Sequence, residues 1–396
     1  MEGRVLAIFY IYGIDVSIQS VLEKGNFDQM LLEVENLSKT SDVYLSTKDG
    51  HSYSNLFKGK VLHLFSRFFI LPDTTIGKSL TGVIFFGAGF FSLLKKVKKV
   101  DVIVSQGTTC LHGAIGNFLF HKPVILYLQY FSYNEQSLFG RNVLSTLFRL
   151  IEMFSIRNCS IVIAPNERLR AEAFASGAKS VQIIPNFVST REIDKIRNRD
   201  VLRGKLGFDA DIRVILFVGR LHPVKNLGFL LKSFSRLEKL AKSVLIILGD
   251  GPEKQRLMEL ACNIGIKNRV RFEGFKPKNV VLEYMKAADV FVLPSLVEGQ
   301  PRVILEAWAC ELPVVASKVK GIENLVTNGF DGLLFNLSSE EELVKSISKA
   351  LENETANAIR VNAKRHVALY SEDKVLSQQE LVVKKFMSKS KYDSEE

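Results

Sequence analysis

The sequence predicts an α/β fold built from two doubly wound, Rossmann-like domains, each a parallel sheet covered by helices on both faces. Three observations lead to this prediction. The chain has 396 residues, which suits two domains better than one. Short apolar runs alternate with segments of helical spacing, and short turns that contain glycine join them. Such alternation is typical of a parallel sheet buried between helices.

The C-terminal half shows the alternation most clearly. We expect strands in the apolar runs 212–220, 243–253, 269–275, 289–295, 312–317 and 332–335. Between the first two runs, Leu227, Leu230, Leu231 and Phe234 recur at the spacing of one helix face. Another helix is expected over roughly 301–310, with Trp308 in its core-facing side. This half therefore predicts one complete doubly wound domain.

The N-terminal half repeats the pattern less regularly. Strands are predicted in 4–12, 42–47, 101–107, 122–131, 160–166 and 180–186, and a helix over 143–158. The following segment is charged and poor in strand formers, as expected for a domain boundary. The predicted organisation is an N-terminal domain 1–190, a linker 191–211, a C-terminal domain 212–370, and a segment 371–396 that forms a helix returning to the N-terminal domain and a frayed tail.

Composition and charge narrow the class of protein. The formal net charge is +11, spread over both halves, and no basic block of the kind that binds nucleic acid is present. A diffuse basic surface suits anionic small molecules or an anionic membrane face, and it equally suits solubility alone. The four cysteines form no C-x-x-C pair, which indicates reduced thiols in a cytoplasmic protein. The first residues are typical of a strand and not of a signal peptide.

Three stretches rich in polar and glycine residues follow predicted strands of the C-terminal half. Arg220 and Lys225 follow the first strand, Gly251 follows the second, and a segment from Glu298 to Glu306 follows the fourth. Ligands of open parallel sheets bind outside the carboxyl ends of the strands, so we expect these stretches to share one site. Arg and Lys there would bind phosphate oxygens.

The stretch between Glu298 and Glu306 predicts how a ligand lies in that site. Gly299 allows a tight turn, and Pro301 suits the first turn of a helix whose N-terminus would attract an anion. Glu298 precedes this helix, whereas Glu306 lies more than one turn inside it. The two carboxylates are therefore expected at different depths along one ligand, with its anionic part between them. A sugar, a diphosphate and a ribose, in that order, would fit.

The stretches 217–226, 247–257, 271–275, 288–317 and 321–335 together resemble the retaining GT-B-fold glycosyltransferases of family 4. The resemblance is specific over about 212–350 and weaker over 164–186. It implies two domains facing across a cleft, transfer of a hexose from a nucleotide-diphosphate sugar (a UDP-sugar or GDP-mannose), retention of anomeric configuration, and no metal or other cofactor. It also implies that the loop after 270–274 holds the base.

The same resemblance assigns residue roles. Arg220 and Lys225 look like the pair that binds the diphosphate, Glu298 touches the transferred sugar, and Glu306 holds the ribose hydroxyls. Together with Glu298, Arg220 and Lys225 form the predicted catalytic set. The remaining predicted donor-binding residues are Gly219, Asn226, Gly251, Gly299, Gln300, Arg302 and Val303.

The chain departs from the family pattern at several positions. Gln300 and Pro301 stand where an aromatic residue and a glycine are usual, and Pro301 has no N–H to offer a phosphate. On the acceptor side, Gly13 stands alone where a glycine pair is common, and Gln129 stands near the usual place of a histidine. Phe187 replaces a common glycine. Gly13 and Gln129 are the predicted acceptor-side residues.

Other features have competing interpretations. Residues 79–94 carry no charge and include Phe85, Phe86, Phe90 and Phe91; Lys95, Lys96, Lys98 and Lys99 follow. This stretch is either a buried helix or a helix on a membrane surface. His222 either contacts the ligand site or caps a turn. Asp209 and Asp211 mimic a metal-binding D-x-D motif, but they precede a strand and are interpreted as solvated. Cys110 and His112 are too few for a metal site.

The sequence therefore predicts a hexosyltransferase whose acceptor is a lipid-linked or other membrane glycoconjugate. It would be cytoplasmic, either free or peripheral on the cytoplasmic face of a membrane. The alternative is a catalytically silent GT-B subunit that binds a nucleotide sugar, or nothing, within a glycan-assembly complex. The Phe-rich N-terminal half is the reason to expect a membrane-presented acceptor.

Overall fold

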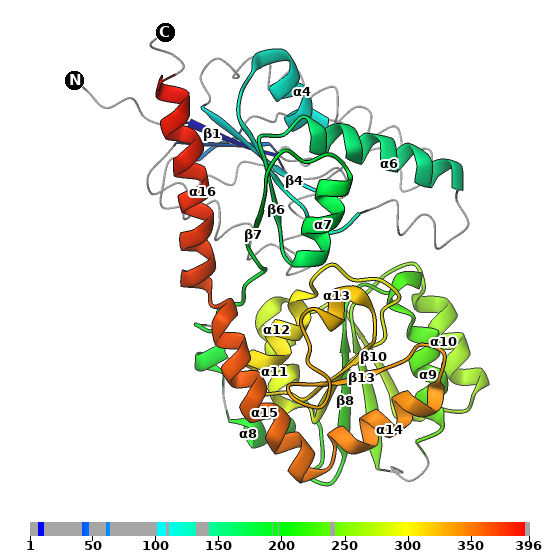
Figure 1. Cartoon of the computed structure of the whole chain (residues 1–396). Coiled ribbons are helices and arrows are strands. Elements are labelled where there is room, and N and C mark those ends of the chain that lie inside the picture. Colours follow the sequence, from blue (N-terminus) through cyan, green and yellow to red (C-terminus); the bar gives the residue numbers. More distant parts are fainter. Residues whose placement is uncertain are drawn as a thin grey trace. The chain divides into compact units, whose positions relative to one another are not determined.

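The chain forms two compact units, each with its own parallel sheet (Figure 1). The structure is a computed structural model, and it describes residues 7–11, 42–46, 61–63, 101–107, 111–131, 142–191, 193–196, 198–237 and 242–392. The first unit comprises Met1–Pro185 and Val375–Glu396, and the second comprises Asn186–Lys374. Gly13, Cys110 and the stretch 79–99 lie outside the described residues.

The first unit holds a seven-stranded sheet of order β3-β2-β1-β4-β5-β6-β7. Its strands are β1 (Ala7–Ile11), β2 (Asp42–Ser46), β3 (Val61–His63), β4 (Val102–Gln106), β5 (Val124–Tyr127), β6 (Ile161–Ala164) and β7 (Val181–Ile183). The described helices are α4 (Leu111–Phe120), α6 (Asn142–Arg157), α7 (Glu167–Ala175) and α16 (Glu372–Tyr392), which extends from the second unit. Residues 102–104 of β4 and all of β5 and β6 are apolar and buried, as in a sheet covered on both faces.

The second unit holds a six-stranded sheet of order β10-β9-β8-β11-β12-β13. Its strands are β8 (Arg213–Val218), β9 (Ser243–Leu248), β10 (Val270–Gly274), β11 (Val290–Leu293), β12 (Val314–Ser317) and β13 (Leu333–Phe335). Its helices are α8 (Arg199–Lys205), α9 (Leu227–Ser235), α10 (Lys254–Asn263), α11 (Lys278–Ala287), α12 (Arg302–Ala309), α13 (Lys320–Glu323), α14 (Glu340–Ala350) and α15 (Asn353–Val367).

Helices cover both faces of the second sheet. Helices α8, α11, α12 and α15 lie on one face, and α9, α10 and α14 lie on the other (Figure 1). Leu227, Leu230, Leu231 and Phe234 are all buried on the sheet side of α9, so the predicted helical spacing is confirmed. Trp308 of α12 is fully buried, as predicted. The predicted two-domain α/β architecture is therefore the observed one.

The strand order places a topological switch point in each unit. In the second unit the chain runs from β8 outward through β9 and β10, and then returns to β11 beside β8 before it continues to β12 and β13. The chain therefore leaves β8 and β11 toward opposite edges of the sheet, and ligands of open parallel sheets bind at such a point. The corresponding switch point of the first unit lies between β1 and β4.

Strand β3 and helix α8 are among the elements that were not predicted individually. Strand β3 was not predicted, because three residues are too short a run to show alternation. Helix α8 lies within 191–211, for which the sequence predicts a linker. Leu202 and Arg203 of α8 are buried, and Arg203 donates to backbone carbonyls, so tertiary contacts stabilise a segment whose local sequence is merely polar.

The three cysteines within the described residues are free, and Cys159 and Cys310 are buried. Burial raises the pKa of Cys159 and of Cys310 to about 12 in each case, so these thiols stay protonated at neutral pH.

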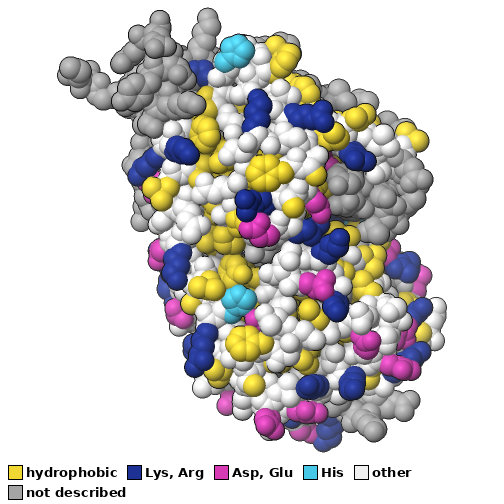
Figure 2. Space-filling model, in the orientation of Figure 1, with side chains coloured by type: hydrophobic (Ala, Val, Ile, Leu, Met, Phe, Trp, Pro, Cys, Tyr) yellow, Lys and Arg dark blue, Asp and Glu magenta, His cyan; other side chains and the backbone are white. Residues whose placement is uncertain are grey.

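Asp209 and Asp211 are exposed, and Asp211 pairs with the exposed Lys242, in agreement with the solvated interpretation. Basic side chains are scattered singly over the face in Figure 2.

Candidate functional site at the β8–β11 switch point

The loops that follow β8, β9 and β11 are joined by backbone hydrogen bonds. Leu221 N–H donates to the Asp250 carbonyl (2.9 Å), which joins the loops after β8 and β9. Leu296 N–H donates to the Val224 carbonyl (2.8 Å), which joins the loops after β8 and β11 across the switch point. These bonds hold the three predicted stretches together at the carboxyl ends of the strands.

Glycine makes this close approach possible. A Cβ atom on Gly249 would lie 1.9 Å from the carbonyl oxygen of Gly219, and one on Gly251 would lie 2.4 Å from that of Leu221. Both glycines also have positive φ (138° and 158°), and the backbone of Gly249 lies in a region that few L-residues adopt. Of the predicted site residues, Gly251 thus allows the β9 loop to lie against the β8 loop, and Gly219 supplies the carbonyl that Gly249 approaches. Asn226 adopts the left-handed conformation (φ 54°), which asparagine tolerates better than most residues.

Lys225 and Glu298 contact each other directly across the switch point. The Nζ of Lys225 lies 2.6 Å from Oε1 of Glu298, and both side chains are mostly buried (23% and 11% exposed). The structure therefore brings together two residues that the sequence assigned separately, one to the diphosphate and the other to the sugar. Without a ligand, the cation and the carboxylate neutralise each other. An anionic ligand that engages Lys225 would compete with this ion pair.

Arg220 differs from Lys225 in having no such partner. Its side chain is exposed, and no ion pair or side-chain hydrogen bond involves its guanidinium within the described part of the chain. The guanidinium therefore keeps its five N–H donors for water or for an anion that approaches the loop. Arg220 and Lys225 follow the same strand, five residues apart in the sequence.

Glu306 lies on α12, as predicted, and forms a second lysine–carboxylate pair. The Nζ of Lys278 lies 2.8 Å from Oε1 of Glu306. Lys278 is the first residue of α11 and follows the β10 loop. Sequence reasoning assigned that loop to the base but missed Lys278. The signal was the closely spaced Lys276 and Lys278 in "FKPKN", which is weak because lysines are common at exposed helix ends.

Helix α12 begins at Arg302, and Pro301 is its N-cap residue, within one residue of the prediction. Val303 lies in the first turn and is half-buried. Trp308 Nε1 donates to the carbonyl of the buried Asp331 (2.9 Å), which anchors the C-terminal part of the helix. The N-terminus of α12 thus occupies a defined place next to Gly299, which is buried. This anchoring positions Glu306 relative to Glu298.

Gln300 is engaged inside the protein. Its Oε1 accepts from the backbone N–H of Asn186 (2.6 Å), and its carbonyl accepts from Nδ2 of Asn186 (2.8 Å). Both residues are buried. In this arrangement the Gln300 side chain supports the turn before α12, and its role as a donor ligand stays a prediction. Asn186 precedes Phe187, where the sequence departs from the family pattern.

The remaining predicted site residues divide between the two units. Gln129 lies two residues beyond β5 in the first unit and is half-buried. Gly13 lies outside the described residues. His222 is the N-cap residue of the short 3₁₀ helix Pro223–Lys225, and its side chain makes no capping hydrogen bond. Within the described residues, no group of three or more His, Cys, Asp and Glu side chains could hold a metal ion.

Comparison with known proteins gives a family match for the second unit. Residues 198–366 match the family described as glycosyl transferases group 1. The UDP-Gal:alpha-D-GlcNAc-diphosphoundecaprenol alpha-1,3-galactosyltransferase of Escherichia coli is 27% identical over 287 residues, which cover 70% of this chain and 73% of that protein. The lipopolysaccharide core biosynthesis glycosyltransferase LpsE of Rhizobium meliloti is 31% identical over 171 residues, 43% of this chain and about half (47%) of LpsE.

Solved structures match nearly the whole chain. Anabaena Alr3699/HepE in complex with UDP and glucose gives a TM-score of 0.77 at 21% identity and covers 96% of this chain and 100% of its own. The sucrose-phosphate synthase of Thermosynechococcus elongatus gives a TM-score of 0.79 at 18% identity and covers 97% of this chain and 99% of its own. The fold is GT-B. Together with the family match, these likenesses support a glycosyltransferase, that is, a transferase of the EC 2.4 type.

Replacing Gly321 tests whether the Glu298 loop depends on a close backbone contact. A Cβ atom at Gly321 would lie 1.9 Å from the Glu298 carbonyl oxygen and 2.7 Å from that of Gly299. Gly321→Ala should therefore displace this loop and cost about 1–3 kcal/mol of unfolding free energy. Gly204→Ala is the matched control, because a Cβ there meets nothing within 4 Å. Calorimetric melting would measure the loss of stability; a wild-type melting temperature for Gly321→Ala would contradict the packing argument.

Proposed function

We propose that the protein is a retaining, metal-independent hexosyltransferase of family 4 that uses a nucleotide-diphosphate sugar, either a UDP-sugar or GDP-mannose. The observation that carries the proposal is the placement of Arg220, Lys225, Glu298 and Glu306 around the β8–β11 switch point. Two cations follow one strand and two carboxylates follow the neighbouring strand, with the start of α12 between the carboxylates. The HepE structures that the fold resembles contain UDP, UDP-glucose, or UDP and glucose.

In the proposed reaction the diphosphate takes the place of the Glu298 carboxylate as the partner of Lys225. Arg220 adds a forked donor to the same anion. As the bond from the anomeric carbon to the diphosphate breaks, its electron pair leaves with the phosphate oxygen, and both cations stabilise that charge. The acceptor hydroxyl forms the new bond on the same face of the sugar, and its proton leaves with the diphosphate. Glu298, released from Lys225, accepts hydrogen bonds from the transferred sugar.

Glu306 supports the nucleotide end of the donor. Its carboxylate would accept hydrogen bonds from the ribose hydroxyls, and Lys278 holds the carboxylate in place through their 2.8 Å contact. Lys278 also stands at the end of the β10 loop, beside the proposed position of the base. The distance between the sugar end and the ribose end is set by α12, because Glu298 precedes this helix and Glu306 lies within it.

We further propose that the acceptor is a lipid-linked or membrane glycoconjugate bound through the first unit. The E. coli and R. meliloti relatives are named for a diphosphoundecaprenol substrate and for lipopolysaccharide core biosynthesis. Helix α6 supports the proposal, because Val143, Leu147, Leu150 and Phe154 recur on one face and are exposed, Val143 by 87%. The exposed Arg149 and Arg157 lie on the same helix. Among the described helices, none is long and apolar enough to cross a membrane.

The donor can be identified by thermal shift with a panel of UDP-, GDP- and ADP-sugars, followed by a transfer assay with the best binder. The proposed function predicts that one nucleotide series raises the melting temperature and that its sugar is transferred with retained configuration. A shift without transfer or hydrolysis would instead favour a binding subunit. No shift with any nucleotide sugar would remove the donor assignment.

Replacing Glu298 or Glu306 by glutamine should affect different quantities, the turnover number in one case and the donor affinity in the other. Glu298→Gln should lower kcat by about 100-fold or more, because it alters the group beside the reacting sugar. Glu306→Gln should mainly raise the donor Kd by about tenfold, because a charged hydrogen bond to the ribose is lost. Glu341→Gln, on the exposed side of α14, is the charge-matched control. Equal effects of both variants on donor affinity alone would show that the order of sugar and ribose along α12 is incorrect.

Membrane association can be tested by flotation with vesicles of phosphatidylcholine, with and without phosphatidylglycerol. We expect flotation only with the anionic lipid, since the α6 face combines apolar side chains with arginines. The double variant Leu147→Gln/Leu150→Gln should lose flotation. Val361→Gln/Leu369→Gln removes two equally exposed apolar side chains from the second unit and should retain it. Full flotation of the α6 variant would exclude this helix as the contact.

A further inference from the structure

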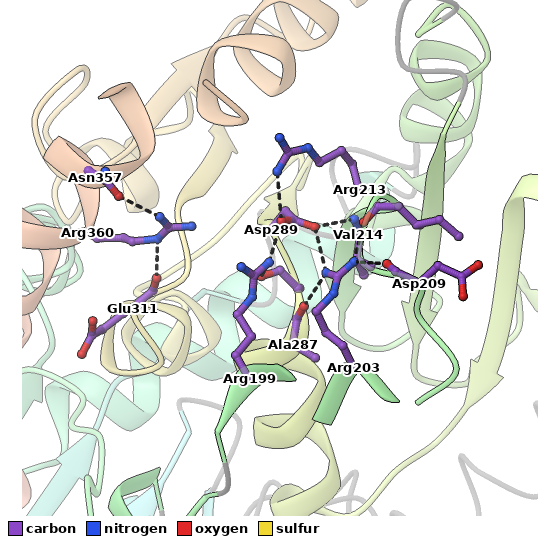
Figure 3. A network of polar contacts seen from close by, with 12 residues as sticks. Arg199, Arg203, Asp209, Arg213, Val214, Ala287, Asp289, Glu311, Asn357 and Arg360 are labelled. Atoms are coloured by element: carbon purple, nitrogen blue, oxygen red, sulfur yellow. Dashed lines mark hydrogen bonds and ion pairs between the residues drawn. The ribbon is translucent and has the colours of Figure 1, made fainter. Parts of the chain in front are cut away.

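A buried carboxylate stands at the opposite end of the second sheet from the candidate site. Asp289 directly precedes β11, and its side chain is 6% exposed. Its oxygens contact Arg199 (2.6 Å), Arg203 (3.3 Å) and Arg213 (3.6 Å) and accept from the backbone N–H of Val214 (2.7 Å). Figure 3 shows these groups converging on Asp289 from α8 and from the first residues of β8.

Arg203 serves the fold. It is buried and donates to the carbonyls of Asp209, Ile212 and Ala287 besides its contact with Asp289. Asp289 therefore has Oδ2 occupied by Arg203 and Val214, and this part of the network is fully hydrogen-bonded. These hydrogen bonds between Arg203, Asp289 and Val214 attach α8 to the amino ends of β8 and β11. The function of the other arginines requires a separate explanation.

The guanidinium groups of Arg199, Arg213 and Arg360 make only some of the hydrogen bonds that they can donate. Arg213 is 45% exposed and makes a single ion pair at 3.6 Å, longer than a hydrogen bond. Arg199 is 41% exposed and donates through Nη2 alone. Arg360, on α15, donates to the Glu311 carbonyl and to Oδ1 of Asn357 through Nε and Nη1. Within the described part of the chain, each guanidinium thus keeps donors without a protein acceptor.

The cations outnumber the carboxylates. The Glu311 carboxylate forms an ion pair with Lys364 (2.8 Å), whereas Arg199, Arg203 and Arg213 all form ion pairs with the single carboxylate of Asp289. Burial, and after it the charge of Arg199, lower the pKa of Arg360. The side chain of Arg360 points toward Arg199 and Asp289 in Figure 3. A set of guanidinium groups held together with spare donors and excess positive charge has the chemistry that recognises phosphate.

We propose that Arg199, Arg213 and Arg360 form a second anion site, one that binds a phosphate group. It lies at the amino ends of β8 and β11, whereas the donor site lies at their carboxyl ends, so the two sites are separate. A bound phosphate accepts hydrogen bonds from α8, from the start of β8 and from α15, and it neutralises the excess charge. The site does not depend on the proposed transfer reaction. The phosphate belongs either to free phosphate or a small ester, or to a lipid headgroup.

Calorimetric titration with inorganic phosphate at low ionic strength tests the site in the full chain. Wild type should bind about one equivalent of phosphate. The Arg220→Gln variant, which alters the candidate donor site, should bind the same amount. Arg213→Gln and Arg360→Gln should each weaken binding by about tenfold, a difference of about 1.4 kcal/mol. Arg170→Gln, another exposed arginine with an ion-pair partner, is the matched control and should bind as wild type does.

The stability of Arg213→Gln separates a ligand site from a structural ion pair. Because its 3.6 Å contact is long and exposed, its loss should leave the melting temperature in the absence of phosphate unchanged. Phosphate should then raise the melting temperature of wild type but not of Arg213→Gln or Arg360→Gln. Equal phosphate affinity in wild type and in these two variants, no binding to wild type, or loss of binding in Arg220→Gln alone would each overturn the proposal.

Vesicle sedimentation distinguishes the two sources of the phosphate. If the ligand is a headgroup, vesicles with phosphatidic acid should retain wild type and the Leu147→Gln/Leu150→Gln variant, but release Arg213→Gln/Arg360→Gln. If the ligand is a soluble phosphate, the arginine variant should sediment with these vesicles as wild type does, while its affinity for inorganic phosphate falls. Either result supports the site and assigns its ligand.

Discussion

The close approach of three loop backbones at the carboxyl ends of β8, β9 and β11 is the constraint on which the candidate site depends. Gly249 and Gly251 let the β9 loop lie against the carbonyls of Gly219 and Leu221, where a Cβ atom would collide. Gly321 does the same beneath the Glu298 loop. Because these contacts involve backbone atoms, side-chain rotation cannot relieve them. The loops therefore present Arg220, Lys225 and Glu298 in a fixed relation.

Electrostatic pairing is the second feature of the site. Lys225 with Glu298, and Lys278 with Glu306, are two partly buried lysine–carboxylate pairs. Breaking such a pair leaves a charge that has lost its solvation, so a ligand must replace the lost partner. A diphosphate can replace a carboxylate beside Lys225, whereas a neutral sugar cannot. The pairs thus favour ligands that carry an anion and hydroxyl groups together.

The two ends of the second sheet carry different chemistry for one topological reason. All its strands are parallel, so the loops that follow the strands lie at their carboxyl ends, where ligands bind in such sheets. The segments that lead into the strands lie at the amino ends. At the amino ends Asp289 and Arg203 attach α8 to the sheet, Arg199 and Arg213 form ion pairs with the same carboxylate, and Arg360 of α15 points toward it (Figure 3). The arginines come from α8, β8 and α15, which are far apart in the sequence, and only the fold brings them together.

The sequence by itself determined the two-domain α/β fold, most strands, helices α6, α9 and α12, the placement of Arg220, Lys225 and Glu298 after strand ends, and that of Glu306 within α12. These features follow from local periodicity, from turn residues and from the rule that ligands bind at the carboxyl ends of parallel strands. Tertiary structure alone decided which charges meet. The contacts of Lys225 with Glu298, Lys278 with Glu306, Gln300 with Asn186, and the arginines with Asp289 join residues separated by 28 to 114 positions. Such pairs leave no periodic trace in the chain, because their partners are selected by strand order and helix packing and not by local spacing.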